Sequence, residues 1–215
     1  MHSSVIGCYE SGLHSVAAGE EHGWSIRSQD GVVREFPLQS WCGGLIPGDE
    51  TLLECCTGPT LDVGCGPGRL TEALAQRGVP VLGVDIAPEA IRRTRARGVA
   101  ALRRDVFGPI PGEGRWQHVI LADGNVGIGG EPRRLLERAG ELLAPGGSVL
   151  CEIERPGTSL RRLQLRLERA DQHSAWFPWA LLGADELSRT APEIGFQLCR
   201  MWTEAGRWFS QLVAV

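Results

Sequence analysis

Short apolar runs alternate with amphipathic stretches through the middle of this chain, beginning at Thr60. Apolar runs of roughly four to eight residues between turn residues are typical of buried strands, whereas apolar residues three and four positions apart are typical of helices. Five strands are predicted on this basis, at 60–63, 79–84, 99–103, 116–122 and 148–153. Helices are predicted between them at 69–77, 88–97 and 132–143, the second ended by Gly98.

The first 58 residues carry a weaker pattern. A β-hairpin is predicted because residues 24–27 and 32–38 surround the turn sequence Ser-Gln-Asp-Gly at 28–31. Asp49 is expected to cap a short helix, which ends near the two breakers Gly58 and Pro59.

After the fifth strand, leucines alternate with polar residues over 163–167, which predicts an inserted strand. A helix is then expected at 185–194, followed by a hairpin of two strands at 196–202 and 208–213.

Strands alternating with helices predict an α/β fold with a doubly wound, Rossmann-like, mostly parallel sheet. We expect this core over residues 59–215, with an insert at about 156–182. Residues 1–58 are expected to be an extension that covers the substrate together with the insert.

A glycine-rich turn follows the first predicted strand. Gly64, Gly66 and Gly68 stand at alternate positions between a strand and a helix, so the backbone there can approach a ligand closely. Dinucleotide sites use the spacing Gly-x-Gly-x-x-Gly to seat a pyrophosphate. The different spacing found here, with a proline inside the turn, favours a ligand that has no pyrophosphate.

Acidic residues follow successive strands. Asp85 ends the second strand, where a carboxylate can accept hydrogen bonds from both ribose hydroxyls, and Asp105 follows the third. Asp62, at the end of the first strand, completes one crevice at the carboxyl edge of the sheet. The alternatives are that Asp85 caps the next helix and that Asp105 begins a loop.

These motifs resemble those of the class I S-adenosylmethionine-dependent methyltransferases, over roughly residues 59–152. The matching segments are Leu-Asp-Val-Gly-Cys-Gly-Pro-Gly at 61–68, Val-Asp-Ile at 84–86, Asp-Val at 105–106, Ala-Asp-Gly at 122–124 and Leu-Leu-Ala-Pro-Gly-Gly at 142–147. The resemblance implies a seven-stranded sheet with an antiparallel last strand, and an enzyme that binds S-adenosylmethionine and releases S-adenosylhomocysteine.

The resemblance also implies roles for individual residues. The three glycines would line the methionine half of the cofactor, and Asp62 would anchor its ammonium group directly or through water. Asp85 would take the ribose hydroxyls, and Asp105 would accept from the adenine amino group. The remaining cofactor contacts would be Ile86, Val106, Ala122 and Asp123.

Candidate residues for the acceptor side lie outside these motifs. His173 is a candidate general base, since His is a frequent proton acceptor in catalysis, and His14 and His22 are weaker candidates. His118 is expected to pack inside the fold. Asn125 could hydrogen-bond the substrate, or could belong to a flexible glycine-rich loop. The candidate substrate contacts are Trp41, Arg155, Trp176 and Trp179.

Composition excludes several classes of function. All 22 basic residues are arginine, so the lysine of a P-loop or of a pyridoxal enzyme is missing. The net charge of −4 argues against a nucleic-acid surface. Seven cysteines without Cys-x-x-Cys spacing indicate neither a disulfide framework nor a metal site. No apolar run is long enough to cross a membrane, and no export signal is visible, so a cytoplasmic location is expected.

The prediction is therefore a methyltransferase acting on a small-molecule acceptor. An all-arginine, glycine- and alanine-rich composition suggests a GC-rich bacterial genome, and by analogy a natural-product acceptor. Three alternatives stay open at this point: a dehydrogenase that binds a nicotinamide dinucleotide, a methyltransferase acting on RNA or protein, and a non-catalytic nucleotide-binding module. The sequence does not determine the oligomeric state.

Overall fold

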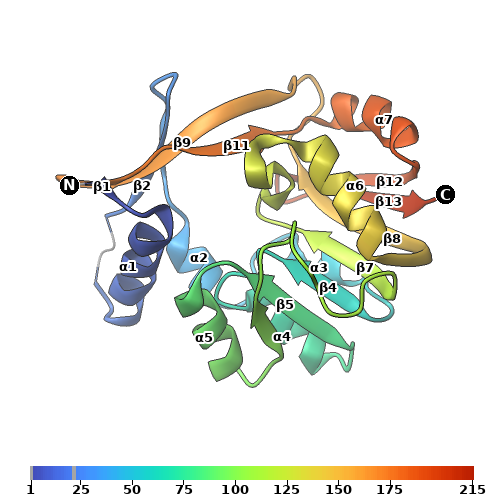
Figure 1. Cartoon of the computed structure of the whole chain (residues 1–215), viewed down its shortest axis with the longest axis horizontal. Coiled ribbons are helices and arrows are strands. Elements are labelled where there is room, and N and C mark those ends of the chain that lie inside the picture. Colours follow the sequence, from blue (N-terminus) through green and yellow to red (C-terminus); the bar gives the residue numbers. More distant parts are fainter. Residues whose placement is uncertain (1, 21–22) are drawn as a thin grey trace.

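The computed structural model describes residues 2–20 and 23–215, and these residues form two β-sheets surrounded by helices (Figure 1). In this described part, seven strands form the larger sheet in the order β12-β13-β8-β7-β4-β5-β6. Its strands are β4 (Thr60–Val63), β5 (Val81–Asp85), β6 (Ala101–Arg103), β7 (Trp116–Leu121), β8 (Leu143–Ile153), β12 (Phe196–Glu204) and β13 (Arg207–Ala214). Strand β13 runs opposite to the other six strands of this sheet, which share one direction. The predicted doubly wound sheet with an antiparallel last strand is confirmed.

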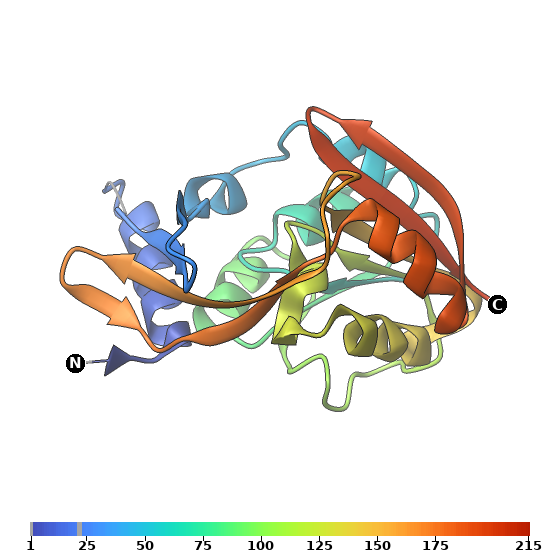
Figure 2. The same ribbon diagram turned by 90° about the horizontal axis from the view of Figure 1, so that it is seen from above.

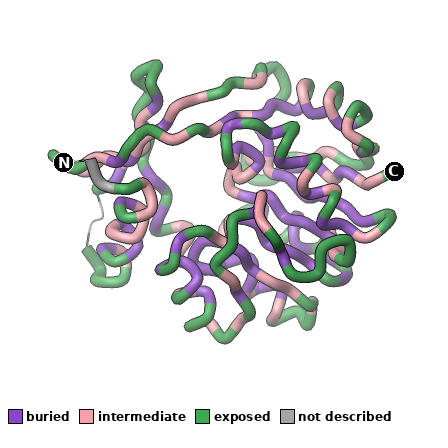
Figure 3. The backbone as a smooth tube through the Cα atoms, in the orientation of Figure 1, coloured by how far each residue is buried: buried purple, intermediate pink, exposed green. Residues whose placement is uncertain are grey.

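Helices cover both faces of this sheet because the side chains of a strand point alternately to its two faces. Within β7, Val119 and Leu121 enter the core under α6 and α7, while Ile120 enters the core under α3 and α4. The covering elements are α3 (Asp49–Leu53), α4 (Arg69–Gln76), α5 (Pro88–Ala96), the 3-10 segment η1 (Asn125–Gly130), α6 (Pro132–Leu142) and α7 (Ala184–Glu193). Buried residues accordingly follow the central strands (Figure 3).

The second sheet combines the N-terminal extension with the insert. Its strands are β1 (His2–Ser3), β2 (Ser25–Ser28), β3 (Val33–Glu35), β9 (Arg161–Arg169), β10 (Gln172–Ser174) and β11 (Phe177–Leu181). The predicted hairpin and the predicted inserted strand are therefore present, and they pair with each other: β2 lies antiparallel to β9, with Ile26 opposite Leu167. We call this sheet, together with α1 (Val5–Ala17) and α2 (Leu38–Cys42), the cap; Figures 1 and 2 show it reaching out beside α5.

Helix α1 has no counterpart in the sequence prediction, which placed no element before residue 24. Its apolar stripe is thin, since only Cys8 and Leu13 among its large apolar side chains are buried. Ser4 begins the helix, because its hydroxyl accepts a hydrogen bond from the Gly7 N–H at 2.9 Å. Packing against the cap sheet and α5 stabilises a helix that its own composition predicts poorly.

The arginine run of α5 is not the solvated face that a charge run normally indicates. Arg93 Nη2 donates to the Leu13 carbonyl at 2.7 Å, and Arg97 Nη2 donates to the Cys42 carbonyl at 2.6 Å. Arg97 Nε also donates to the Pro67 carbonyl in the glycine turn, at 2.8 Å. Two arginines one helical turn apart therefore attach the cap to the core, while the side chain of Arg92 is 64% exposed.

Two details of the predicted elements are wrong. Asp49 does not cap α3 from outside: Gly48 holds the cap position, and Asp49 is the first helical residue, fully buried among arginines. Strand β8 begins at Leu143 rather than at residue 148, because its pairing with β7 continues across an irregularity at the Pro-Gly-Gly segment. None of the helices in the described ranges is both long and apolar enough to cross a membrane.

Candidate functional site at the glycine turn

The turn between β4 and α4 holds three glycines in the left-handed region, with φ of 71° at Gly64, 53° at Gly66 and 92° at Gly68. Side chains already occupy the space beside the first and third: Asn125 lies against Gly64, and Thr94 lies against Gly68. Beside Gly66, the Tyr9 hydroxyl would stand 3.2 Å from a Cβ, closer than an ordinary van der Waals contact. All three glycines are thus closely packed by side chains, with Gly66 and Gly68 buried and Gly64 half-buried.

Asp85 stands beside this turn, at the end of β5, and is half-buried. Its Oδ2 accepts from the Gly66 N–H at 3.0 Å and its Oδ1 accepts from the Ala87 N–H at 2.8 Å. Burial raises the pKa of the Asp85 carboxyl above its ordinary value. The same carboxylate thus fixes the glycine turn and the entry to α5. Next to it, the Ile86 side chain is 51% exposed, which offers an apolar surface at the rim.

Asp62 lies deeper, on β4. It is 2% exposed, and its Oδ2 accepts from the Thr71 hydroxyl of α4 at 2.6 Å. Burial, with the nearby charges of Asp123 and Asp85, raises the pKa of Asp62 to about 7. The carboxyl group is therefore bonded to α4 and shielded from solvent.

The third acid, Asp105, lies at the end of β6 in an exposed turn. Its Oδ1 accepts from the Phe107 N–H at 3.0 Å. Val106 is buried, and the Phe107 ring carries the Arg134 guanidinium 4.1 Å above its centre. Of the three acids in the predicted crevice, Asp85 ends β5 and Asp105 lies two residues beyond β6, so both stand at the carboxyl edge of the sheet, whereas Asp62 is buried within β4.

Ala122 and Asp123 follow β7 directly. Ala122 is buried, and Asp123 has a φ of 52°, which is unusual for a residue other than glycine. Its Oδ2 accepts from Arg69 Nη2 at 2.6 Å, and its N–H donates to Glu152 Oε2 at 2.7 Å. Burial raises the pKa of Asp123, and the two nearby arginines oppose that shift. These bonds hold the strained residue in place.

Asp123 is one member of a buried charge network that the sequence did not reveal. Arg69, at the start of α4, pairs with Asp49 as well as with Asp123. Arg207, at the start of β13, makes two bonds to Glu152, at 2.9 and 2.8 Å, and one to Asp49 at 2.8 Å. Three carboxylates thus share two guanidinium groups where α3, α4, β7, β8 and β13 meet.

Asn125 binds protein backbone in this structure. Its Nδ2 donates to the carbonyls of Val63 and Gly64, both at 3.0 Å. The side chain therefore holds the end of β4 against η1 and fixes the first glycine of the turn. A positioning role fits these bonds directly.

Two of the predicted acceptor-side tryptophans lie beside the turn or η1. Trp41, in α2, packs edge-on against Phe36 with ring centres 5.0 Å apart and against Tyr9 at 6.3 Å. Trp179, in β11, lies against η1, since a Cβ on Gly127 would be 2.7 Å from its Nε1. Tyr9 was missed by the sequence prediction because it belongs to the unpredicted helix α1; the one available signal was that the chain contains a single tyrosine.

The other predicted acceptor-side residues are not gathered at the turn. His173 lies in β10, which pairs with β1 beside the N-terminus (Figure 1). Trp176 is 38% exposed and lies under the Arg166 guanidinium, and Arg155 is exposed after β8. His14 forms an ion pair with Glu89 at 3.4 Å, and His22 lies outside the described residues.

His118 packs inside the fold as expected. Its Nδ1 lies 2.9 Å from the Ser148 hydroxyl, and its Nε2 accepts from the Thr57 N–H at 3.2 Å. Burial lowers the pKa of this imidazole below its ordinary value, so it is held in the neutral form that these bonds require.

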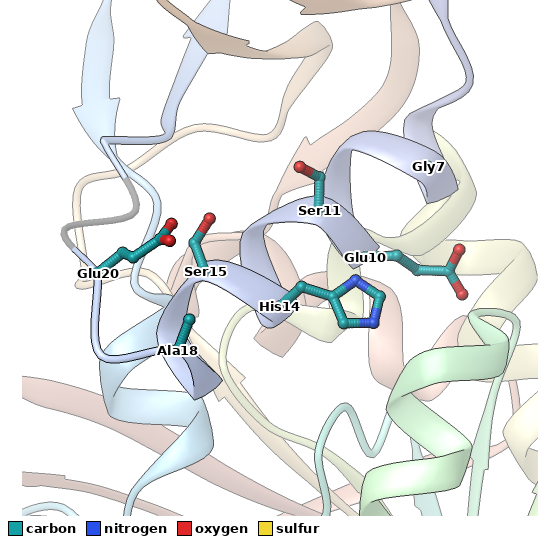
Figure 4. Close-up of a pocket in the computed structure, with 7 residues that line it drawn as sticks. All are labelled: Gly7, Glu10, Ser11, His14, Ser15, Ala18 and Glu20. Atoms are coloured by element: carbon teal, nitrogen blue, oxygen red, sulfur yellow. The ribbon is translucent and has the colours of Figure 1, made fainter.

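A separate hollow of about 460 Å³ lies along α1, as Figure 4 shows. It is lined by Gly7, Glu10, Ser11, His14, Ser15, Ala18 and Glu20. This lining contains neither the glycine turn nor any of the acids at the strand ends, so the hollow is distinct from the candidate site.

Comparison with known proteins identifies the central part of the chain. Residues 60–147 match the family described as "Methyltransferase domain". Trans-aconitate 2-methyltransferase of Paracidovorax citrulli is 34% identical over 97 residues, which are 43% of this chain and 37% of that protein. A ubiquinone biosynthesis O-methyltransferase of Xanthomonas euvesicatoria is 25% identical over 160 residues, 67% of this chain and 56% of that protein. The matching part of the chain thus spans 37% of the first relative's length and 56% of the second's.

The fold recurs in a solved structure. A methyltransferase of Bacteroides fragilis, crystallised with S-adenosyl-L-homocysteine, superposes with a TM-score of 0.82 and 23% identity. The match covers 99% of this chain and 95% of that one, so the cap is included in the likeness. At this identity the likeness is one of fold.

Proposed function

Because residues 60–147 of this chain form a class I S-adenosylmethionine-dependent methyltransferase domain, we propose that the protein methylates a small-molecule acceptor. The observation that carries the proposal is the half-buried Asp85 at the end of β5, whose carboxylate binds the Gly66 N–H of the glycine turn that leads into helix α4. A nucleoside with an amino-acid tail fits such a strand end, because ribose hydroxyls need an acceptor and the tail can lie along the glycine turn.

Each motif residue receives one role in this proposal. Gly64, Gly66 and Gly68 line the methionine half of the cofactor, and Asp85 accepts from the ribose hydroxyls. Asp105 accepts from the adenine amino group, between the apolar side chains of Ile86 and Val106. Asp62 acts on the ammonium group through the turn or an ordered water, and Ala122 and Asp123 close the methionine end. When bound, S-adenosylmethionine supplies an electrophilic methyl group on a sulfonium.

The residues of the chain contribute to the reaction by positioning the acceptor relative to the methyl group. Methyl transfer is an in-line displacement at an activated carbon, so the protein needs to align the acceptor and to exclude water. Asn125 and the charge network hold the turn and the end of β7 rigid. Trp41 and Trp179 are proposed to wall an apolar or planar acceptor, with Arg155 available for a substrate anion.

The acceptor is proposed to belong to bacterial secondary metabolism. Two facts support a small acceptor from a bacterium: the arginine-only basic composition, and relatives named for trans-aconitate and ubiquinone biosynthesis. A screen of phenols, carboxylic acids and amines with labelled cofactor would find the class. Transfer of label to RNA or to protein in place of any small molecule would contradict the proposal.

The deciding experiment is calorimetric titration of S-adenosylmethionine, S-adenosylhomocysteine and NAD. Wild type is expected to bind the first two and not NAD. Asp85→Ala should weaken that binding about 10- to 100-fold, since a charged hydrogen-bond acceptor is lost. Asp171→Ala, which removes an exposed carboxylate from the β9–β10 turn, is the matched control and should change nothing. Binding of NAD alone would favour a dehydrogenase.

The need for a general base can be measured directly. A phenolate or neutral amine acceptor needs no base from the protein. His173 was the sequence candidate, but β10 lies beside β1 at the N-terminus, so His173→Ala is expected to keep turnover within about twofold. A pH-dependent loss of turnover of more than tenfold would make His173 the base.

A further inference from the structure

The least expected residue at the glycine turn comes from the cap. Tyr9, in α1, is separated from Gly66 by 57 positions of chain, yet its hydroxyl would stand only 3.2 Å from a Cβ on that glycine. Nothing in the glycine motif or the strand-end acids requires a residue from this helix.

The polar contacts of α1 with α5 hold Tyr9 over the turn. Arg93 Nη2 donates to the Leu13 carbonyl at 2.7 Å, and Glu10 Oε1 accepts from the Glu89 N–H at 2.9 Å. His14 adds an ion pair to Glu89. These contacts lie one to five residues from Tyr9 along the helix, so the phenol is placed by the docking of α1 rather than by a flexible loop.

The phenol has acidic neighbours. Gly66 donates its N–H to Asp85, so the Tyr9 hydroxyl beside Gly66 is also near that carboxylate. Burial, then the charges of Asp85 and Cys65, raise the pKa of Tyr9 well above its usual value. A phenol in this setting keeps its proton and acts as a hydrogen-bond donor.

The opposite side of the Tyr9 ring belongs to the aromatic cluster of the cap. Its ring lies edge-on to Phe36, with centres 5.9 Å apart, and edge-on to Trp41 at 6.3 Å. One side chain therefore reaches from the proposed acceptor wall to the turn on which the cofactor is proposed to lie.

We propose that Tyr9 is a cofactor-binding residue supplied by the cap, whose hydroxyl donates a hydrogen bond to an oxygen of bound S-adenosylmethionine. This inference rests on the proposed function and extends it. Cofactor binding then fixes α1, and through the Tyr9 ring it fixes the aromatic wall that the acceptor meets. Bound cofactor is thereby expected to raise the affinity for an acceptor that packs on this wall. By linkage, the bound acceptor then raises the affinity for the cofactor by the same factor.

The first test compares two variants that each remove one hydroxyl from α1. Tyr9→Phe is expected to weaken the binding of S-adenosylhomocysteine about 3- to 10-fold in calorimetry, the loss of one hydrogen bond. Ser11→Ala, on the wall of the separate hollow, should stay within twofold of wild type. Thermal melting of each variant checks that the fold is retained.

The second test uses the fact that the chain has a single tyrosine. Incorporating 3-fluorotyrosine gives one fluorine resonance, from Tyr9. Saturating S-adenosylhomocysteine is expected to shift it in wild type and in Ser11→Ala. This readout needs no acceptor and no turnover.

The outcomes separate this inference from the proposed function. If wild type binds S-adenosylhomocysteine, while Tyr9→Phe binds equally well and the fluorine resonance does not move, the cofactor proposal stands and the role of Tyr9 is refuted. If wild type binds neither S-adenosylmethionine nor S-adenosylhomocysteine, both are refuted.

Discussion

Asp62 is a buried carboxyl group whose pKa is raised to about 7, chiefly because burial penalises its charged form. In the unfolded chain an aspartate titrates near pH 4. Between about pH 4 and 7 the folded protein therefore holds a proton that the unfolded chain has released, so the free energy of unfolding falls as the pH rises. The destabilising contribution is absent below about pH 4 and complete above about pH 7.

We therefore expect Asp62→Asn to melt several degrees higher than wild type at pH 8, in the absence of cofactor, and by a clearly smaller margin at pH 5, where only part of the penalty has developed. The amide has the same shape and its oxygen can still accept from the Thr71 hydroxyl. Melting curves from pH 5 to 8.5 measure the effect. Asp171→Asn, an exposed site, should show no such trend. A stability difference independent of pH would contradict the titration of Asp62.

Asn125 offers a second prediction at the scale of one residue. Its amide nitrogen donates to two carbonyls of the glycine turn, so Asn125→Ala removes a donor, while Asn125→Asp places a carboxylate against the same carbonyls. The affinity for S-adenosylhomocysteine should fall in the order wild type, alanine, aspartate, with aspartate weaker by at least about tenfold. A residue that only contacted the acceptor would change KM and leave the cofactor Kd unaltered.

At this scale the sequence predicted the positions whose chemistry is local. The three glycines of the turn indicate backbone with a positive φ. An acidic residue at the end of a parallel strand is placed at the crevice by the topology of the sheet alone. Tyr9 could not be predicted, because its place depends on how α1 docks on α5. For the same reason the sequence could not show that Asn125 would bind the backbone of β4.

The packing of β13 against β8 and α3 depends on the positive charge of Arg207. Arg207 binds Glu152 and Asp49 and lies 3.5 Å from Asp123, with its own side chain 15% exposed. Arg207→Gln leaves these buried carboxylates poorly compensated, and removing one partner of a buried pair typically costs about 3–5 kcal/mol. We expect a loss of about 3 kcal/mol in urea unfolding at pH 7.5.

The compensating variant is the sharper measurement. Adding Glu152→Gln to Arg207→Gln removes one unpaired charge, so the double variant should be more stable than Arg207→Gln alone. Arg189→Gln is the control, since its ion pair with Glu186 is on the surface and worth less than about 1 kcal/mol. Additive losses in the double variant would mean that the two side chains act independently.

Elements with a strong apolar period were predicted, and elements held by tertiary contacts were not. The strands of the larger sheet alternate between two cores or are buried throughout, as β4 is, and this pattern is visible in the sequence. Helix α1 is rich in glycine and serine, so its composition resembles a loop. Strand β8 was predicted too short because a Pro-Gly-Gly segment normally ends an element, whereas here the ladder to β7 continues beyond it.

For the whole molecule, the sequence predicted a core with two additions but not how the additions combine. The extension and the insert are more than a hundred residues apart, and β2 and β9 nevertheless form one ladder. The sequence of a strand shows its own alternation but contains no pattern that identifies the distant strand with which it pairs. The bonds of the arginine run of α5 could not be predicted either, because its partners are backbone carbonyls from another part of the chain.

The attachment of the cap can be tested through these arginines. Arg97→Met removes the bonds from α5 to the Cys42 and Pro67 carbonyls while keeping an unbranched apolar side chain. We expect faster hydrogen exchange in α2 and in residues 43–48, and a KM for the acceptor raised severalfold, because a loosened cap spends less time closed over the glycine turn. Exchange in β4 and β7 should not change. Arg92→Met on the same helix, whose side chain is 64% exposed, is the matched control. Equal exchange in α2 for both variants would mean that the apolar contacts of the cap, and not the arginines, hold it to the core.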